Sequence, residues 1–210
     1  MTADRRTQIS ADLRASAEQS AGICVPRLGV ALIGHGAPAL DCPPQFIGEL
    51  MELEWQAGHH AGDIQGRAAQ LDAKIRDWPR RIDNDPYKQG LERIAAALRP
   101  LLPTDLLAVG YNEFCRPSIA EAVESLIRRG AGRILVIPTM LTPGGVHSEI
   151  DIPRALDELR RVHPAVSVEY VWPFDLGEVA GLLASHVRRS AERGKINTQE
   201  RDESRLCDHA

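Results

Sequence analysis

The fold is decided by residues 133–153, which read RILVIPTMLTPGGVHSEIDIP. The first part, Ile134 to Pro138, is a continuous apolar run of the kind found in strands that are buried on both faces. Gly144 and Gly145 follow, and they predict a turn in which the backbone can approach another group closely. His147 stands between this turn and a predicted helix, so the stretch predicts a buried strand that delivers an imidazole at its carboxyl end.

A second stretch near the start of the chain has the same design. Leu28 to Gly34 is another apolar run, and it leads directly into His35 and Gly36. Further strands are predicted at 105–111 and 166–171, and amphipathic helices at 46–55, 87–98, 117–130, 151–161 and 176–188. Strands that alternate with helices predict an α/β fold: a doubly wound sheet of four mainly parallel strands with flanking helices.

The helix boundaries follow from residues with special backbone preferences. Pro117 suits the first turn of one helix, and Gly130 suits the position just after its end. Asp151 is predicted to be the N-cap of the next helix, with Pro153 in its first turn.

The predicted organisation is one α/β domain over residues 26–190 with a long insertion after the first strand, at about 41–86. Residues 1–25 are predicted to be a flexible tail, and residues 191–210 a polar C-terminal tail. The middle of the insertion, 59–86, is polar and is predicted to lack regular structure.

Composition narrows the class of protein. The net charge is −4, which argues against a general nucleic-acid binder. No apolar run approaches 18 residues, so no membrane span is expected. The four cysteines (Cys24, Cys42, Cys115 and Cys207) form no C-x-x-C pair, and scattered cysteines of this kind are typical of reduced thiols in a cytoplasmic protein.

Three titratable residues are expected on one rim of the sheet, because ligands of open parallel sheets bind outside the carboxyl ends of the strands. They are His35, Glu113 and His147. Neutral imidazole binds divalent iron, cobalt, nickel or zinc, and it also exchanges a proton near neutral pH. Glu113 can accept a proton or raise the basicity of a histidine. The sequence therefore predicts a metal or proton-transfer site.

Each residue also has a purely structural interpretation. A histidine at a strand end is often only a hydrogen-bonding residue, and Glu113 can simply complement a helix dipole. Asp151 is better explained as a cap than as a catalyst. His59 and His60 lie in a polar stretch that is typical of a solvated loop, and the basic cluster at 74–81 becomes interesting only for a polyanionic substrate. The convergence of His35, Glu113 and His147 is what favours function.

Three segments resemble the sirohydrochlorin chelatases, the small ATP-independent class II chelatases of cobalamin and sirohaem synthesis. They are Gly34-His35-Gly36; Asn112-Glu113-Phe114-x-x-Pro117-Ser118-Ile119; and Pro138-x-x-Leu141-x-x-Gly144-Gly145-x-His147-x-x-x-Asp151-Ile152-Pro153. The last segment is the most specific, because it combines a strand, a glycine turn, a histidine and a helix start at fixed spacing. The resemblance runs in order from about residue 30 to 188, interrupted by the insertion.

The resemblance implies a chelatase-type α/β fold and insertion of a divalent metal into a tetrapyrrole. His35 and His147 would hold the metal or accept the pyrrole protons, and Glu113 would assist. It implies no tightly bound cofactor, since Co²⁺, Fe²⁺ or Ni²⁺ is a substrate, and a homodimer, which is typical of members with one unit. The absence of phosphate-binding glycine motifs agrees with chemistry that needs no nucleotide.

The substrate-binding residues are predicted on chemical grounds. Gly144 and Gly145 leave room for a flat ring, and Arg116 can meet a substrate carboxylate where the family has a neutral or acidic residue. The insertion is not part of the family pattern. One hypothesis makes it a lid, with Trp55 or Trp78 against the macrocycle and Arg80 or Arg81 on its carboxylates.

Two other functions compete with the chelatase interpretation. A non-catalytic carrier of tetrapyrrole or metal would keep the pocket without turnover, but the complete set of His35, Glu113 and His147 favours an enzyme. A nucleotide-binding domain lacks its glycine fingerprint. The physiological metal stays open, because cobalt, iron and nickel accept the same donors.

Overall fold

The computed structural model describes residues 25–57 and 63–207. Four strands, β1 (Leu28–Gly34), β2 (Leu107–Tyr111), β3 (Arg133–Pro138) and β4 (Ser167–Tyr170), form one sheet in the order β2-β1-β3-β4. All three pairings are parallel. The sheet predicted from the apolar runs is confirmed. The predicted tail at 1–25 and the His59-His60 pair lie outside the described residues, except for Val25.

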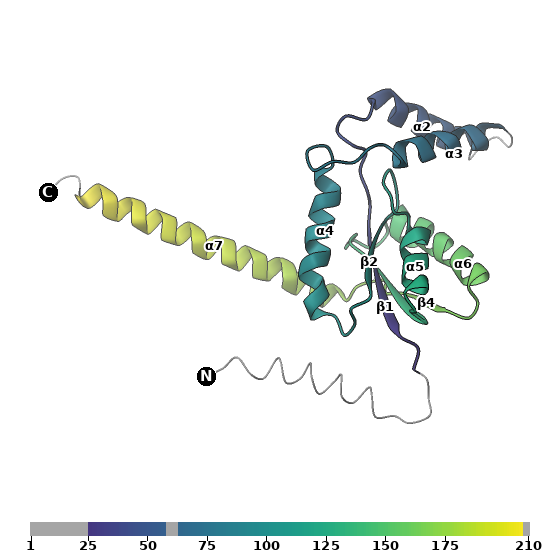
Figure 1. The fold of residues 1–210 in the computed structure, drawn as a ribbon. Helices are drawn as coiled ribbons and strands as arrows, with labels where there is room; N and C mark the ends of the chain where they lie inside the picture. The colour runs from purple at the N-terminus through teal and green to yellow at the C-terminus, as the bar shows by residue number, and fades with distance from the viewer. Residues whose placement is uncertain (1–24, 58–62, 208–210) are drawn as a thin grey trace. The chain divides into compact units, whose positions relative to one another are not determined.

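Strand β1 is central in the sheet, and its two faces contact different parts of the core. Ala31 and Ile33 pack with α5 (Ile119–Arg128) and α6 (Ile152–Val162). The alternate residues of the strand pack instead with α4 (Pro86–Leu98). Helices therefore cover both faces, as Figure 1 shows, and the predicted doubly wound arrangement is confirmed. A strand enclosed in this way must be apolar throughout.

The insertion after β1 contains two helices, α2 (Pro44–Ala57) and α3 (Asp63–Arg76), which pack on each other. The expectation of an irregular polar segment at 59–86 was therefore wrong over α3. The physical reason is an apolar stripe at 64, 68, 71 and 75, which recurs at helical spacing within an otherwise polar sequence. This stripe joins a small separate core that includes Ile75, Leu50 and Phe114.

The helix boundaries correct two predictions. Helix α5 begins after Ser118, whose side chain accepts a hydrogen bond from the Glu121 N–H while Glu121 bonds back to the Ser118 N–H. This capping box, rather than Pro117, starts the helix. Gly130 ends it with a φ of 88°, as predicted. The second correction concerns Asp151 and belongs to the site described below.

The remaining elements are a 3₁₀ turn, η1 (Arg99–Leu101), a π-helical turn, η2 (His147–Asp151), and the long helix α7 (Leu176–Cys207). Helix α7 continues beyond Arg188, where its end was predicted, because residues 189–207 are rich in good helix formers and contain no proline. The contacts divide the chain into two units, Met1–Trp172 and Pro173–Ala210. The division at residues 25 and 190 stays a prediction.

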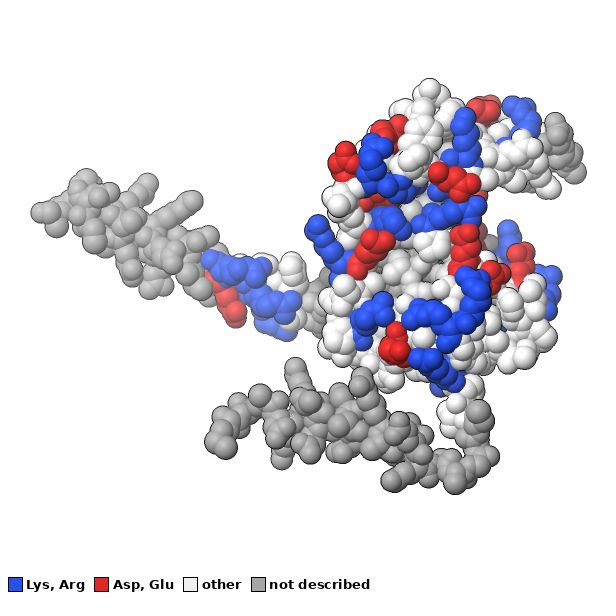
Figure 2. All heavy atoms as spheres, in the orientation of Figure 1, with Lys and Arg blue, Asp and Glu red and all other residues white. Residues whose placement is uncertain are grey.

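No helix in the described ranges has both the length and the apolar character that crossing a membrane requires. Basic and acidic side chains are interleaved on the face of the molecule shown in Figure 2. Many charged side chains of the described residues form ion pairs, for example Arg27 with Asp105 at 3.0 Å and Arg133 with Glu169 at 2.7 Å. This face therefore carries mixed charge.

Candidate metal centre

Three neighbouring strands deliver the three residues of the site. His35 directly follows β1, Glu113 follows β2 by two residues, and His147 begins the turn η2 after β3. Because β1 lies between β2 and β3 and all three run parallel, their carboxyl ends meet at one edge of the sheet. The convergence predicted from the sequence is what the structure shows.

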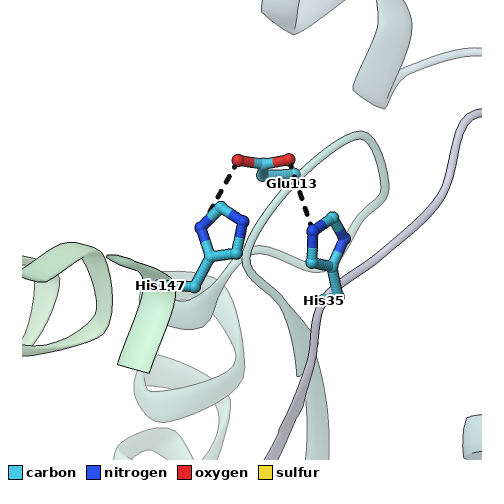
Figure 3. A group of neighbouring side chains, drawn as sticks. All are labelled: His35, Glu113 and His147. Carbon is cyan, nitrogen blue, oxygen red and sulfur yellow. Dashed lines mark ion pairs between the residues drawn. The ribbon is translucent and has the colours of Figure 1, made fainter. Parts of the chain in front are cut away.

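The three side chains lie close enough together to hold one metal ion. One ligand atom from each of His35, Glu113 and His147 lies within 4.8 Å of the other two. The carboxylate lies between the rings: Glu113 Oε2 is 3.9 Å from His35 Nε2, and Glu113 Oε1 is 3.6 Å from His147 Nδ1 (Figure 3). The two imidazoles meet edge to face, with centroids 4.6 Å apart. A single divalent cation fits the donor set of two nitrogens and one carboxylate.

The loop that carries His35 is held against the loop that carries Glu113 by backbone contacts. The Glu113 N–H donates to the His35 carbonyl at 2.8 Å, and the His35 N–H donates to the Tyr87 hydroxyl at 2.8 Å. Gly36 makes this approach possible: its φ is 95°, and a Cβ there would stand 1.9 Å from the Glu113 carbonyl oxygen. Only glycine fits, so Gly36 is a structural part of the site.

His147 is held by a residue that was assigned another role. Asp151 does not cap α6: its backbone is already helical, with φ −70° and ψ −49°, and its side chain makes no capping bond. The helical path begins four residues earlier, at His147, so the two residues share one face. Asp151 Oδ2 lies 2.8 Å from His147 Nδ1. The N-cap prediction was therefore wrong, because the turn η2 moves the start of the helix.

This contact determines how His147 can act. A nitrogen and a carboxylate oxygen 2.8 Å apart share a hydrogen, so we place the ring proton on Nδ1. The Asn112 amide nitrogen lies 3.0 Å from the same atom, but it is itself a donor and cannot accept this proton, so only the Asp151 carboxylate can do so. With Nδ1 engaged, Nε2 keeps its lone pair for a metal, which is the usual arrangement of a histidine ligand backed by a carboxylate.

A cleft of about 610 Å³ adjoins the centre. Its walls come from α2, α3, the loop after β2 and the start of α6. The lining residues are Leu50, Met51, Glu54, Ala68, Ala69, Asp72, Arg76, Asn112, Glu113, Phe114, Asp151 and Arg154. Gly144 and Gly145, which were predicted to face a flat ring, are exposed, and a Cβ on Gly144 would meet nothing within 4 Å. Their role stays a prediction.

The three arginines predicted to bind substrate form ion pairs with acidic side chains of the same chain. Arg116 pairs with Asp77 and Glu121, and Arg81 pairs with Asp41 at 2.8 Å. None of the three is among the residues that line the cleft. Their role in substrate binding stays a prediction.

Arg80 is the most buried of these three arginines. Its guanidinium contacts Asp85 Oδ2 at 2.7 Å and the carbonyl of Ala37 at 2.8 Å, and its side chain is 12% exposed. Asp85 is buried. The pair joins the connection before α4 to the loop after β1.

The insertion that was predicted to be a lid contains α2 and α3, and residues of both helices line the cleft. Trp78 packs against Phe46, with ring centroids 6.2 Å apart, and its Nε1–H donates to Asp41 at 3.1 Å. This tryptophan therefore belongs to the small core beneath the wall. Closure of the wall over a ring stays a prediction.

Sequence reasoning overlooked three charged residues of the cleft, Glu54, Asp72 and Arg154, and considered Arg76 only as part of the basic cluster at 74–81. On amphipathic helices such residues look like a solvated face. One of them is electrostatically unusual. Burial raises the pKa of the Glu54 carboxyl, and the negative charges of Glu113 and Asp72 raise it further. For Asp151, the signal in the sequence that could have revealed its contact with His147 was the i, i+4 spacing of the two residues.

Comparison with known proteins agrees with this geometry. The CbiX family model matches residues 83–192, just over half of the chain, and this range contains Glu113 and His147. A sirohydrochlorin cobaltochelatase from Priestia megaterium is 35% identical over 109 residues, which cover 51% of this chain and 35% of that protein. One from Methanopyrus kandleri is 36% identical over 72 residues, covering 34% of this chain and 50% of that protein. The chain thus spans half or less of these two relatives.

The fold has a solved counterpart. A CbiX protein of cobalamin biosynthesis from Marinobacter aquaeolei VT8 has a TM-score of 0.50 and 15% sequence identity, over 80% of this chain and 98% of that one. At this identity the likeness concerns the fold alone. Together with the family match, it confirms the resemblance found in the sequence: the chain belongs to the CbiX family.

Proposed function

We propose that this chain is a metal chelatase that inserts a divalent ion, Co²⁺ or Fe²⁺, into sirohydrochlorin or a related tetrapyrrole without ATP. The observation that carries the proposal is the convergence of His35, Glu113 and His147 within 4.8 Å. Two relatives that bear the name sirohydrochlorin cobaltochelatase support the choice of reaction.

Metal insertion into a tetrapyrrole requires few functional groups from the protein. Metallation removes two N–H protons from the centre of the macrocycle and replaces them with one divalent cation, so charge is conserved. Nε2 of His147 and an imidazole nitrogen of His35 bind the incoming ion as neutral ligands. Glu113, between the rings, contributes a carboxylate oxygen to the ion or accepts a pyrrole proton.

Asp151 completes this assignment of roles. By accepting the proton on Nδ1 of the neutral ring, it leaves the lone pair on Nε2 and fixes the ring plane. The side chains of His35, Glu113 and His147 are between 28% and 39% exposed. They are thus open enough to exchange a metal ion with the cleft but partly shielded from bulk water.

The proposal is tested by mixing the purified full chain with sirohydrochlorin and Co²⁺ and following the absorbance change against a protein-free blank. A chelatase accelerates metallation catalytically, with many turnovers per chain. The carrier alternative predicts saturable binding of the tetrapyrrole with a metallation rate no higher than that of the blank. Repeating the assay with Fe²⁺ and Ni²⁺ ranks the metals, which the donor set alone does not do.

Two further properties belong to the same proposal. We expect a homodimer, because the described part of the chain holds one four-stranded unit and one-unit chelatases typically pair. Light scattering should then give twice the mass of one chain. We expect a cytoplasmic location, with which the free thiols of Cys42 and Cys115 are consistent.

A further inference from the structure

Among the described residues, the cleft beside the metal centre contains one guanidinium, that of Arg154, which forms no ion pair or hydrogen bond within the protein. We infer that Arg154 binds a peripheral carboxylate of the tetrapyrrole and so positions the ring over the centre; this inference rests on the proposed function. Arg154 lies in the first turn of α6, three residues after Asp151, and its side chain is exposed. It lines the cleft together with Glu113 and Asp151.

The ion pairs of the other arginines single out Arg154. Arg76, the second guanidinium of the cleft, donates to both oxygens of Asp72 at 2.9 and 2.7 Å and to the Asn112 carbonyl at 2.8 Å. Its side chain is only 17% exposed, so it joins α3 to the loop after β2. Within the described part of the chain, Arg154 has neither an ion pair nor a hydrogen-bond partner for its guanidinium.

The rest of the cleft indicates what kind of ligand Arg154 meets. The lining includes apolar side chains, among them Met51, which is 59% exposed, and Phe114, which is buried. The other charged groups at this cleft are mostly acidic: Glu54, Asp72, Glu113 and Asp151. A flat apolar ring fits against Met51, but a polycarboxylate is repelled by these acids. A free guanidinium offsets that repulsion and can form two parallel hydrogen bonds to one carboxylate.

The arrangement therefore separates two tasks within one cleft. The imidazoles and Glu113 attract the metal ion, whereas Arg154 attracts the anionic margin of the ring. Loss of the guanidinium should weaken binding of the tetrapyrrole and leave binding of the metal unchanged. An exposed charge-assisted pair of this kind is worth about a tenfold change in affinity.

The experiment measures the Kd of metal-free sirohydrochlorin by fluorescence titration, so it does not depend on turnover. We expect Arg154→Gln to raise the Kd about tenfold, and Arg154→Lys to raise it less because the charge remains. The matched control is Arg161→Gln, on the same helix, where the exposed guanidinium donates to the carbonyl of Asp157 and to no other group in the described ranges. We expect this control to stay within about twofold of the wild type.

Two readouts separate recognition from a merely structural effect. Co²⁺ affinity, measured by calorimetry, should be equal in the wild type and Arg154→Gln. With the methyl ester of sirohydrochlorin, which lacks the carboxylates, the wild type and Arg154→Gln should bind equally. A wild-type Kd in Arg154→Gln, or the same loss with the ester, overturns the inference.

The inference and the proposed function fail in different ways. If the wild type binds and metallates the ring but Arg154→Gln is indistinguishable from it, only the role of Arg154 falls. If the wild type binds the ring through Arg154 but does not accelerate metallation, only the proposed chelatase activity is contradicted. A wild type that does not bind sirohydrochlorin overturns both.

Discussion

Asp151 Oδ2 lies 2.8 Å from His147 Nδ1, and the two residues stand four apart on one helical face. This contact fixes the ring plane and the tautomer of His147, the residue that we propose as a metal ligand. Two features of the chain produce it: the connection after β3 (Arg133–Pro138) brings the chain to His147, and the helical path begins at His147 itself.

Removal of the Asp151 carboxylate should weaken the metal site without removing a ligand. We expect Asp151→Ala to lower Co²⁺ affinity about tenfold to a hundredfold, the usual effect of losing a carboxylate behind a histidine ligand. The matched control is Asp157→Ala on α6, where the exposed carboxylate pairs with Arg160 of the same helix. Calorimetric titration measures both, and equal affinities would remove Asp151 from the metal site.

Gly36 should be the least replaceable glycine of the site. Gly36→Ala places a Cβ against the Glu113 carbonyl in a left-handed conformation, and we expect it to destabilise the fold by about 2 kcal/mol or more. Gly90→Ala in α4 is the control, because a Cβ there meets nothing within 4 Å. It should stabilise the helix by about 0.5–1 kcal/mol. Urea unfolding gives both values, and equal effects would contradict the close approach.

The two arginines before α4 should differ sharply in their effect on stability. Arg80→Ala leaves Asp85, which is 1% exposed, without its cation, and we expect a loss of about 3–5 kcal/mol. Arg81→Ala breaks pairs in which both partners are exposed, and it should cost less than about 1 kcal/mol. Urea unfolding compares them. A small effect of Arg80→Ala would mean that Asp85 does not depend on this pair.

Glu54 gives the cleft a defined dependence on pH. Desolvation by the surrounding cleft, together with the negative charges of Glu113, Asp72 and Asp151, raises its pKa in the folded state above the ordinary value of 4.5, although the side chain keeps contact with solvent. Ionised Glu54 therefore destabilises the fold at neutral pH, and the effect is lost as the pH falls through the folded-state pKa toward 4.5.

The corresponding variant is Glu54→Gln, which should raise the free energy of unfolding at pH 7. The gain should shrink steadily on acidification and level off below pH 4.5. Glu52→Gln, on the same helix but not among the residues that line the cleft, serves as the control. Thermal unfolding across this pH range makes the comparison, and a gain that does not depend on pH would contradict the electrostatic origin.

Much of the sheet could be predicted, because a strand buried on both faces has to be continuously apolar. Leu28–Gly34 was predicted with the bounds that the structure shows, and Arg133–Pro138 to within one residue. Helix α3 could not be found by overall polarity, since only every third or fourth residue is apolar and it covers a small core rather than the sheet. This segment is helical because its apolar stripe packs on that small core, which is a tertiary effect.

The site was predictable to the extent that parallel strand ends must meet. His35, Glu113 and His147 follow from that rule alone, because topology brings them together regardless of detail. Asp151 did not follow, since the competing rule for helix caps fits the same residue until η2 is seen. Arg154 did not follow either: nothing in the sequence distinguishes an unpaired arginine from a paired one.

The central claim, that the three strand ends form one working metal centre, is tested most directly by the rate of Co²⁺ insertion into sirohydrochlorin for three single variants. We predict that His35→Ala, Glu113→Gln and His147→Ala each lower the rate at least tenfold, about 1.4 kcal/mol or more in the barrier. His186→Ala, an exposed histidine on α7, should keep the wild-type rate. A wild-type rate in any of the three site variants would contradict the account.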